Sequence, residues 1–242
     1  MAWRTQRGDV KWSLGAGMFV NPEVWFVTAG HVFSLVATIS NSLTFVLPGA
    51  RQKRRKKNQE AITHFTFAFT GTGNCSLTAH VNESADVAVG KIDGVVPPSD
   101  YEYPVFRRKD PIAGEMLCRI GFPFAPDDRK VRWTADNRFE ISDLLRCPLF
   151  VNEALVSRIM DLRGDNGSSA GQWIETSSPG LKGQSGGPVA DKDGLICGMQ
   201  VNTEHYPLEF SVRNQYLHVG RAANSGTIRA LLDAHGVVHY TR

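Results

Sequence analysis

The chain lacks the features that mark several large classes of protein. None of its apolar runs approaches the roughly 20 residues that span a bilayer, so we expect no membrane segment. Residues 1–9 lack the apolar core of a secretory signal. The cysteines and histidines do not follow the spacing of a zinc site, and nothing in the sequence implies an organic cofactor. We therefore expect neither a metal nor a cofactor.

Cysteine is scarce. The four cysteines among 242 residues are Cys75, Cys118, Cys147 and Cys197. Cys118 and Cys197 lie within apolar runs, which is typical of core thiols. Pairing stays open, because an even count alone is weak support for disulfides. We expect reduced cysteines and a cytoplasmic location.

Positive charge is concentrated in one segment. Residues 51–57 hold six basic side chains, twice the net charge of +3, so the rest of the chain carries a net charge of −3. Like charges repel and cannot form a core, so we expect an exposed hairpin tip. The segment has no interleaved aromatic residues, so nucleic acid is not an expected partner. An import signal, a docking site and an autocleavage site stay open as its role.

Size and composition suit one globular unit built from two packed lobes. The 242 residues are 42% hydrophobic and 21% charged. We expect the first lobe over residues 1–110 and the second over residues 111–242, with an extended connector at 97–111.

Local patterns predict mostly strands. Residues 15–20 and 24–28 flank a proline turn and are rich in β-branched and aromatic side chains, which indicates a hairpin. Within a further expected strand at 61–70, apolar and polar residues alternate. Other expected strands are 43–47, 86–92, 116–120, 172–176, 187–190 and 195–201. Residues 149–160 fit either a strand or a helix.

A single helix is expected near the end of the chain. Residues 225–236 have a helical pattern, in which Ser225 would be the N-cap and Gly236 would end the helix.

Three segments carry the chemistry. Residues 183–188, Gly-Gln-Ser-Gly-Gly-Pro, place Ser185 between glycines on a tight loop with bare backbone N–H groups. Residues 27–31 end in His31, and residues 85–89 contain Asp86. The chain order His, Asp, Ser is one of the few in which an acyl-transfer triad occurs.

These segments resemble the histidine, aspartate and serine motifs of chymotrypsin-like serine proteases, in the style of HtrA-type bacterial and viral members. Residues 114–124 resemble the strand and turn that open the second barrel of that family, and residues 173–176 resemble the strand that leads to the serine loop. The resemblance implies an all-β fold of two six-stranded antiparallel Greek-key barrels with a short C-terminal helix. No PDZ-like domain is expected after that helix.

The residue types predict a separate catalytic role for each of these residues. A serine hydroxyl needs a base, and His31 has the best context among the seven histidines. Asp86 would orient the imidazole, and Ser185 would attack the peptide carbonyl. The backbone N–H groups of Gly183 and Ser185 would form the oxyanion hole. The competing interpretations are a structural histidine at position 31 and a turn aspartate at position 86, with Asp93 a poorer candidate in a turn.

Gln184 departs from the pattern of processed zymogens in this family. Those proteins carry an aspartate at this place, which pairs with a new N-terminal ammonium, and glutamine cannot form that ion pair. Activation by N-terminal cleavage is therefore not expected. Either the loop is formed constitutively or another event orders it.

The resemblance also implies the substrate-binding residues. One wall of the primary pocket would consist of Pro179, Gly180, Leu181 and Lys182. An edge for an extended substrate would consist of Val201, Asn202 and Thr203, and His218 would lie in the strand that closes the pocket. Pro179 takes the place of the acidic residue of trypsin-like pockets, so a preference for Lys or Arg is unsupported. We expect a small or apolar residue before the cut, with an acidic residue, met by His218 or Lys182, as the alternative.

The sequence thus predicts a serine endopeptidase that acts on a protein or peptide substrate. Two alternatives stay open: a catalytically silent binding module with a protease fold, and a protease that needs an activating partner and cleaves one dedicated substrate.

Overall fold

The structure is a computed structural model. It describes residues 2–12, 15–32, 62–66, 76–93, 96–124, 131–137, 139–141, 148–163, 167, 169–208 and 215–242. The expected strand at 43–47 and the basic segment at 51–57 lie outside the described residues.

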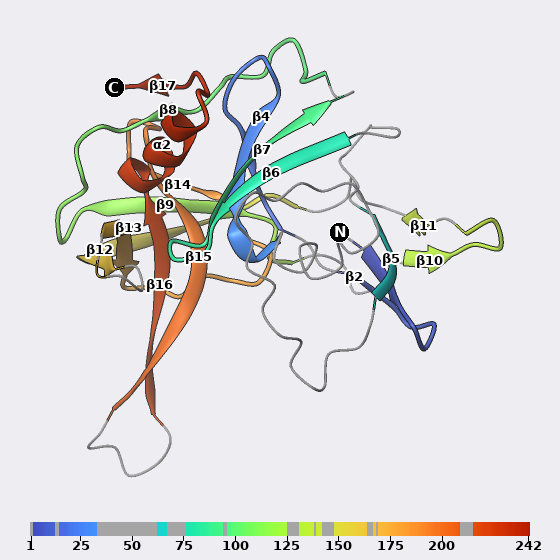
Figure 1. Cartoon of the computed structure of the whole chain (residues 1–242). Coiled ribbons are helices and arrows are strands. Elements are labelled where there is room, and N and C mark those ends of the chain that lie inside the picture. The colour runs from blue at the N-terminus through green and yellow to red at the C-terminus, as the bar shows by residue number, and fades with distance from the viewer. Residues whose placement is uncertain are drawn as a thin grey trace.

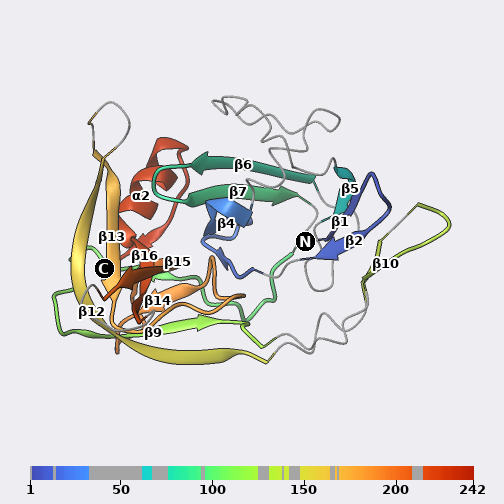
Figure 2. The same cartoon turned by 90° about the horizontal axis from the view of Figure 1, so that it is seen from below.

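The second lobe is a closed six-stranded barrel. Its strands are β9 (Met116–Gly121), β12 (Phe150–Arg163), β13 (Ser169–Thr176), β14 (Pro188–Ala190), β15 (Ile196–Pro207) and β16 (Tyr216–Asn224). They follow one another around the ring in the order β14, β9, β12, β13, β16, β15, and β15 pairs again with β14. Every pairing within this ring is antiparallel. The all-β expectation is confirmed, and Figures 1 and 2 show the barrel with its long strands β12, β15 and β16.

Strand β12 resolves the ambiguous segment at 149–160. Residues 150–155 pair with β9 and residues 156–163 pair with β13, with a register shift between Val156 and Arg158. The register shift lets one long strand bend and serve two neighbours in the barrel wall. Periodicity could not distinguish this strand from a helix, because pairing with two distant strands decides the matter.

The described part of the first lobe contains two small antiparallel sheets. Strands β3 (Met18–Phe19), β4 (Trp25–Ala29), β7 (Val87–Asp93) and β6 (Ser76–Asn82) form one sheet in that order. Strand β4 lies between β3 and β7, and four of its five residues are buried. The second sheet consists of β2 (Val10–Trp12), β1 (Ala2–Thr5) and β5 (Ile62–Thr66).

A hairpin from the second half of the sequence lies beside the N-terminal sheet. It consists of β10 (Val131–Trp133) and β11 (Phe139–Ile141). Figures 1 and 2 both show it near β2, on the far side of the molecule from the C-terminal helix. The guanidinium of Arg4 lies 5.3 Å from the centre of the Trp133 ring, a cation–π contact between the two.

The two lobes share one apolar core. Val27 and Val87 of the first lobe belong to the same buried cluster as Met199 and Val201 of the second. The indole N–H of Trp173, on β13, also donates to the carbonyl of Ala85, at 3.3 Å. The turn that carries Asp86 is therefore fixed by the second barrel.

The terminal helix α2 (Ser225–Ala234) follows β16 directly and packs on the barrel. Its N-cap is Asn224, whose side chain accepts a hydrogen bond from the Gly226 N–H at 2.7 Å. The prediction of Ser225 as the cap is therefore wrong by one residue, because the Ser225 hydroxyl instead donates to the Arg107 carbonyl. Gly236 follows the helix with φ +65°, as expected for a residue just beyond a helix end.

Two short strands add to the barrel sheet near this helix. Strand β8 (Val105–Phe106), within the expected connector, pairs in parallel with β15 and with β17 (Tyr240–Thr241).

Two of the four cysteines are described, and both are free thiols. Cys197 is buried and Cys118 is half-buried. Burial raises the pKa of the Cys197 thiol to about 11, which suits an inert core residue. Within the described ranges, no helix has the length and apolar character needed to cross a membrane.

Candidate active site

His31 lies just beyond the end of β4, where residues 30–32 begin a helical turn. Its Nδ1 is 2.7 Å from Asp86 Oδ2, and its backbone N–H donates to Asp86 Oδ1 at 2.6 Å. Both carboxylate oxygens of Asp86 thus form hydrogen bonds with His31. Because a carboxylate only accepts hydrogen bonds, Nδ1 carries the proton, and in the neutral ring Nε2 keeps its lone pair.

Asp86 itself has an unusual backbone conformation. Its φ is +55°, in the left-handed region that aspartate tolerates better than most residues. Its neighbours Ala85 and Val87 are fully buried, and its carbonyl accepts from the Gly30 N–H at 2.8 Å. A Cβ at position 30 would lie 3.0 Å from Asp86 Oδ1, so glycine permits the close approach of the two segments.

Ser185 lies on a loop that packs against backbone on two sides. Gly183 has φ +98°, and a Cβ there would lie 2.4 Å from the Phe122 carbonyl oxygen. Gly186 has φ +86°, and a Cβ there would lie 2.0 Å from the Ala16 carbonyl oxygen. Both positions therefore require glycine. The Ser185 carbonyl accepts from the Ala16 N–H at 2.8 Å, which ties the serine loop to the first lobe.

The hydroxyl of Ser185 donates to the Val201 carbonyl at 3.2 Å. Val201 stands at a register shift in β15, between Gln200 and Asn202, where pairing with β16 is interrupted. Bulges of this kind redirect backbone groups and are common beside active sites.

The loop leaves two donors unused. Across the described part of the chain, the N–H groups of Gly183 and Ser185 donate no hydrogen bond. The Gln184 N–H between them donates to the Leu181 carbonyl at 2.9 Å. This turn is the arrangement that an oxyanion hole needs, because its donors must be free before the substrate binds.

Gln184 is fully buried and braces this loop. Its Oε1 accepts from the Leu181 N–H at 2.9 Å, and its Nε2 donates to Asn152 Oδ1 at 2.6 Å. The loop thus has an internal support that requires no N-terminal ammonium.

One cavity of about 470 Å³ collects residues from both lobes. Its lining residues are His31, Asp86, Gly180, Leu181, Lys182, Ser185, Gln200, Val201, Asn202 and Thr203. The structure thus brings together the three side chains that the motifs singled out, and most of the residues expected to bind substrate.

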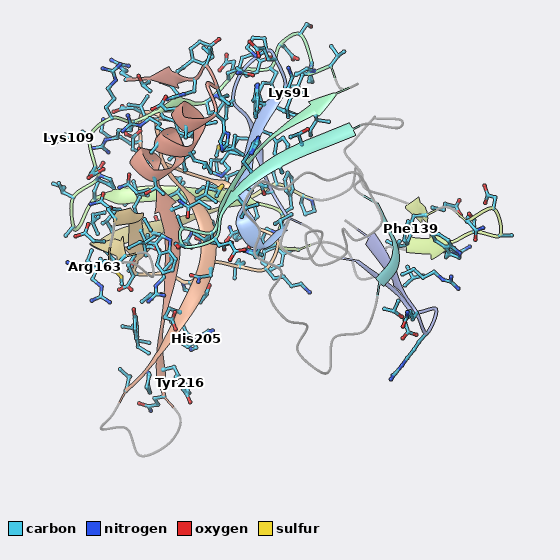
Figure 3. The ribbon with its side chains drawn as sticks, in the orientation of Figure 1. Lys91, Lys109, Phe139, Arg163, His205 and Tyr216 are labelled. Atoms are coloured by element: carbon cyan, nitrogen blue, oxygen red, sulfur yellow. The ribbon has the colours of Figure 1, made fainter. Side chains whose placement is uncertain are left out.

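Two expected binding residues do not line this cavity. Pro179 lies next to Gly180, but its carbonyl faces the barrel interior and accepts from Arg119 at 2.7 Å. His218 is exposed on β16, where its ring contacts that of His205. Figure 3 shows His205 on the hairpin of β15 and β16 that extends away from the barrel. His218 is therefore not among the residues that line this cavity, because its pairing with His205 places it farther along the hairpin.

Gln200 and Arg119 were missed by sequence reasoning. Gln200 lines the cavity with 2% of its surface exposed, and a Cβ on Gly180 would lie 2.1 Å from its Nε2. Arg119 is fully buried behind Pro179. Gln200 lies in the expected strand 195–201 and Arg119 in the family-like segment 114–124, but no pattern in the sequence singled out either side chain. The described residues contain no group of three or more histidine, cysteine, aspartate or glutamate side chains that could hold a metal ion.

Comparison with known proteins identifies the class. The sequence profile of the trypsin-like peptidase domain matches residues 15–199, most of the chain. The chain therefore belongs to the trypsin-like peptidase family, as its motifs predicted. No curated protein sequence matches it.

Two solved structures are similar to this chain. The active form of the Rv3671c protease from Mycobacterium tuberculosis is similar, with a TM-score of 0.52 and 16% sequence identity over 99% of this chain and 80% of that one. A serine endoprotease from Yersinia pestis gives a TM-score of 0.49 and 14% identity over 96% of this chain and 60% of that one. The first of these supports a serine-protease fold.

Proposed function

We propose that this protein is a serine endopeptidase that hydrolyses peptide bonds through an acyl-enzyme on Ser185. The observation that carries the proposal is the hydrogen-bonded pair of His31 and Asp86 in the same cavity as Ser185. Membership in the trypsin-like family supports it.

The chemistry begins with a rotation of the Ser185 hydroxyl from the Val201 carbonyl toward the imidazole, which needs a change in one side-chain torsion. His31 Nε2 then takes the hydroxyl proton as Oγ attacks the substrate carbonyl carbon. Asp86 keeps the proton on Nδ1 and stabilises the imidazolium that forms.

The oxyanion that develops accepts hydrogen bonds from the N–H groups of Gly183 and Ser185, each worth about 3 kcal/mol in the transition state. The imidazolium then gives its proton to the leaving amine, and a water molecule hydrolyses the acyl-enzyme by the reverse sequence. The substrate binds in an extended form along residues 201–203, on the edge of β15 that faces away from β16 and lies beyond the pairing with β14.

A silent binding module and a partner-activated protease are the competing functions. The unused N–H groups of the serine loop and the buried support from Gln184 favour a resting cleft that is already competent. They therefore favour an enzyme that needs no activating partner.

A fluorophosphonate probe tests the proposal. The wild-type protein alone should be labelled on Ser185, and the variants Ser185→Ala and His31→Ala should not. No labelling of the wild type would refute an active resting enzyme, and labelling only after adding a cell extract would indicate a partner-activated one. Cleavage sites mapped by mass spectrometry, with Ser185→Ala as the control, would then define the substrates.

A further inference from the structure

Arg119 is a buried cation within the second barrel. It lies on β9 with none of its surface exposed. Its Nη1 donates to the Pro179 carbonyl at 2.7 Å, and its Nη2 donates to Thr176 Oγ1 at 2.5 Å and to the Ser178 carbonyl at 3.2 Å. All of these partners are neutral oxygens.

The charge of Arg119 has no counter-ion among the described residues. Glu175, which precedes the Arg119 partner Thr176 in the chain, pairs with Arg158 and Arg221 instead. Burial lowers the pKa of Arg119 to about 10, so the guanidinium stays charged at neutral pH. A buried ion without a partner is costly, and a ligand that supplies the opposite charge reduces the cost.

The guanidinium lies directly behind the wall of the cavity. Its carbonyl partners belong to Ser178 and Pro179, and the next residue, Gly180, lines the cavity. A trans peptide places its N–H opposite its C=O, so the Gly180 N–H points away from Arg119. In the described structure this N–H donates no hydrogen bond. It is thus a free donor on a peptide group that the cation polarises.

The opposite side of Arg119 is equally close-packed. A Cβ on Gly220 of β16 would lie 2.6 Å from Arg119 Nη2. The guanidinium is therefore held between the end of β13, the 178–180 segment and β16, with no room to swing away from the cavity wall.

The charges of Lys182 in the cavity lining and of Arg119 behind the wall together outweigh that of the lining carboxylate Asp86. Lys182 lines the cavity with an exposed side chain, and in the described part of the protein its ammonium forms no ion pair. Asp86 is the one carboxylate among the lining residues, and both of its oxygens are engaged by His31. A negatively charged side chain of the substrate would meet a positive field in this cavity.

We propose that the cavity selects substrates with a glutamate or aspartate immediately before the scissile bond, and that Arg119 is the residue that determines this specificity. The Gly180 N–H and Lys182 supply direct contacts, and Arg119 supplies the buried charge behind them. The inference rests on the proposed endopeptidase function. It favours the acidic alternative over the small or apolar residue that the sequence suggested first.

Matched peptides test the substrate class. Five peptides should differ only in the residue before the cut, with Glu, Gln, Ala, Leu and Lys at that place. We expect the wild-type kcat/KM for Glu to exceed that for its neutral isostere Gln by roughly 10- to 100-fold. A ratio near one, in protein that the fluorophosphonate labels, would overturn the inference and leave the proposed function intact. Absence of labelling would count against the function itself.

Variants test the role of Arg119. Arg119→Met removes the charge but keeps the length of the side chain. It should bring the ratio of kcat/KM for the Glu peptide to kcat/KM for the Gln peptide, the Glu/Gln ratio, close to one. Arg119→Lys keeps the charge and should retain most of the ratio. Lys192→Gln is the matched control, since it removes one exposed charge outside the cavity, and its ratio should equal that of the wild type.

A purely structural role for Arg119 predicts a different pattern. Arg119→Met would then lower the melting temperature but leave the Glu/Gln ratio unchanged, and that result would overturn the assignment. If Arg119→Met does not fold, Arg119→Gln removes the charge while keeping N–H donors for the oxygens of Pro179 and Thr176, and its Glu/Gln ratio decides the question in the same way.

Discussion

Replacing Gln184 with leucine should impair catalysis more than it impairs folding. Gln184 is fully buried beside Gly121, and its carboxamide makes two hydrogen bonds, one to Asn152 on β12 and one to the Leu181 N–H beside the serine loop. Leucine has a similar volume and removes both bonds. The variant would leave the Leu181 N–H and Asn152 Oδ1 without their present partners.

The expected loss of kcat/KM follows from the Leu181 N–H and Asn152 Oδ1, which lose their partners. A buried polar group without a partner costs about 1–3 kcal/mol. Leu181 and Asn152 are half-buried, so the low end applies and the two together cost about 2 kcal/mol. If this energy separates the competent loop from a collapsed one, kcat/KM falls about 30-fold, since each 1.4 kcal/mol is a factor of ten.

The assay is kcat/KM on a cleaved peptide, measured beside the melting temperature. Asn152→Leu removes the hydrogen bond between Gln184 and Asn152 by changing its acceptor. The double variant Gln184→Leu/Asn152→Leu completes a double-mutant cycle. We expect the two losses to be less than additive, because both variants break the same contact. Gln172→Leu serves as the matched control, because its side chain makes an exposed hydrogen bond to Asp161 away from the cavity, and its activity should stay within about twofold of wild type.

Two outcomes would refute this account of the loop. One is a Gln184→Leu enzyme with wild-type kcat/KM and a lowered melting temperature, which would make Gln184 a support of the fold alone. The other is a loss of activity in Gln184→Leu that an added partner protein restores in full.

Three further predictions concern the triad, a tight packing site and an ion pair. Asp86→Asn should lower kcat by roughly 10³- to 10⁴-fold with the fold intact by circular dichroism, because an amide does not hold His31 in the required tautomer; a loss below tenfold would contradict the assigned role. Gly90→Ala should cost about 1–3 kcal/mol and lower the melting temperature by several degrees, because its Cβ would lie 2.5 Å from a carbonyl oxygen of β6 and 2.7 Å from an aromatic ring of β4. The hydrogen bond from Arg107 lowers the pKa of Glu115, so the carboxylate stabilises the fold above its ordinary pKa of 4.5, and this stabilisation is lost as the pH falls through the lowered value. The difference in unfolding free energy between wild type and Glu115→Gln should therefore be up to about 1 kcal/mol at neutral pH and vanish in acid, and a difference that does not change with pH would exclude this ion pair as its source.

Local motifs predicted the family and the three side chains of the candidate site. A serine loop needs glycines at 183 and 186 because the backbone there has positive φ, and these glycines are visible in the sequence. The strands around them are also local features, since β-branched and aromatic runs are typical of strands whatever lies next to them.

The placement of side chains within the barrel could not be predicted in the same way. One face of β9 carries Met116, Cys118 and Ile120, and the other carries Leu117, Arg119 and Gly121. The structure buries the face with Arg119 and leaves Met116 exposed. A shift of one residue exchanges the two faces of a strand, and pairing with β12 and β14 decides which face turns inward.

The sequence by itself therefore determined the all-β class, the family and the three side chains that meet in the candidate site, because each of these depends on short-range patterns. Tertiary structure alone decided that His218 lies beyond the cavity, that Gln184 braces the serine loop, and that a buried cation lies behind the cavity wall. These features depend on strand register and on contacts between residues far apart in the chain, and no local pattern specifies either.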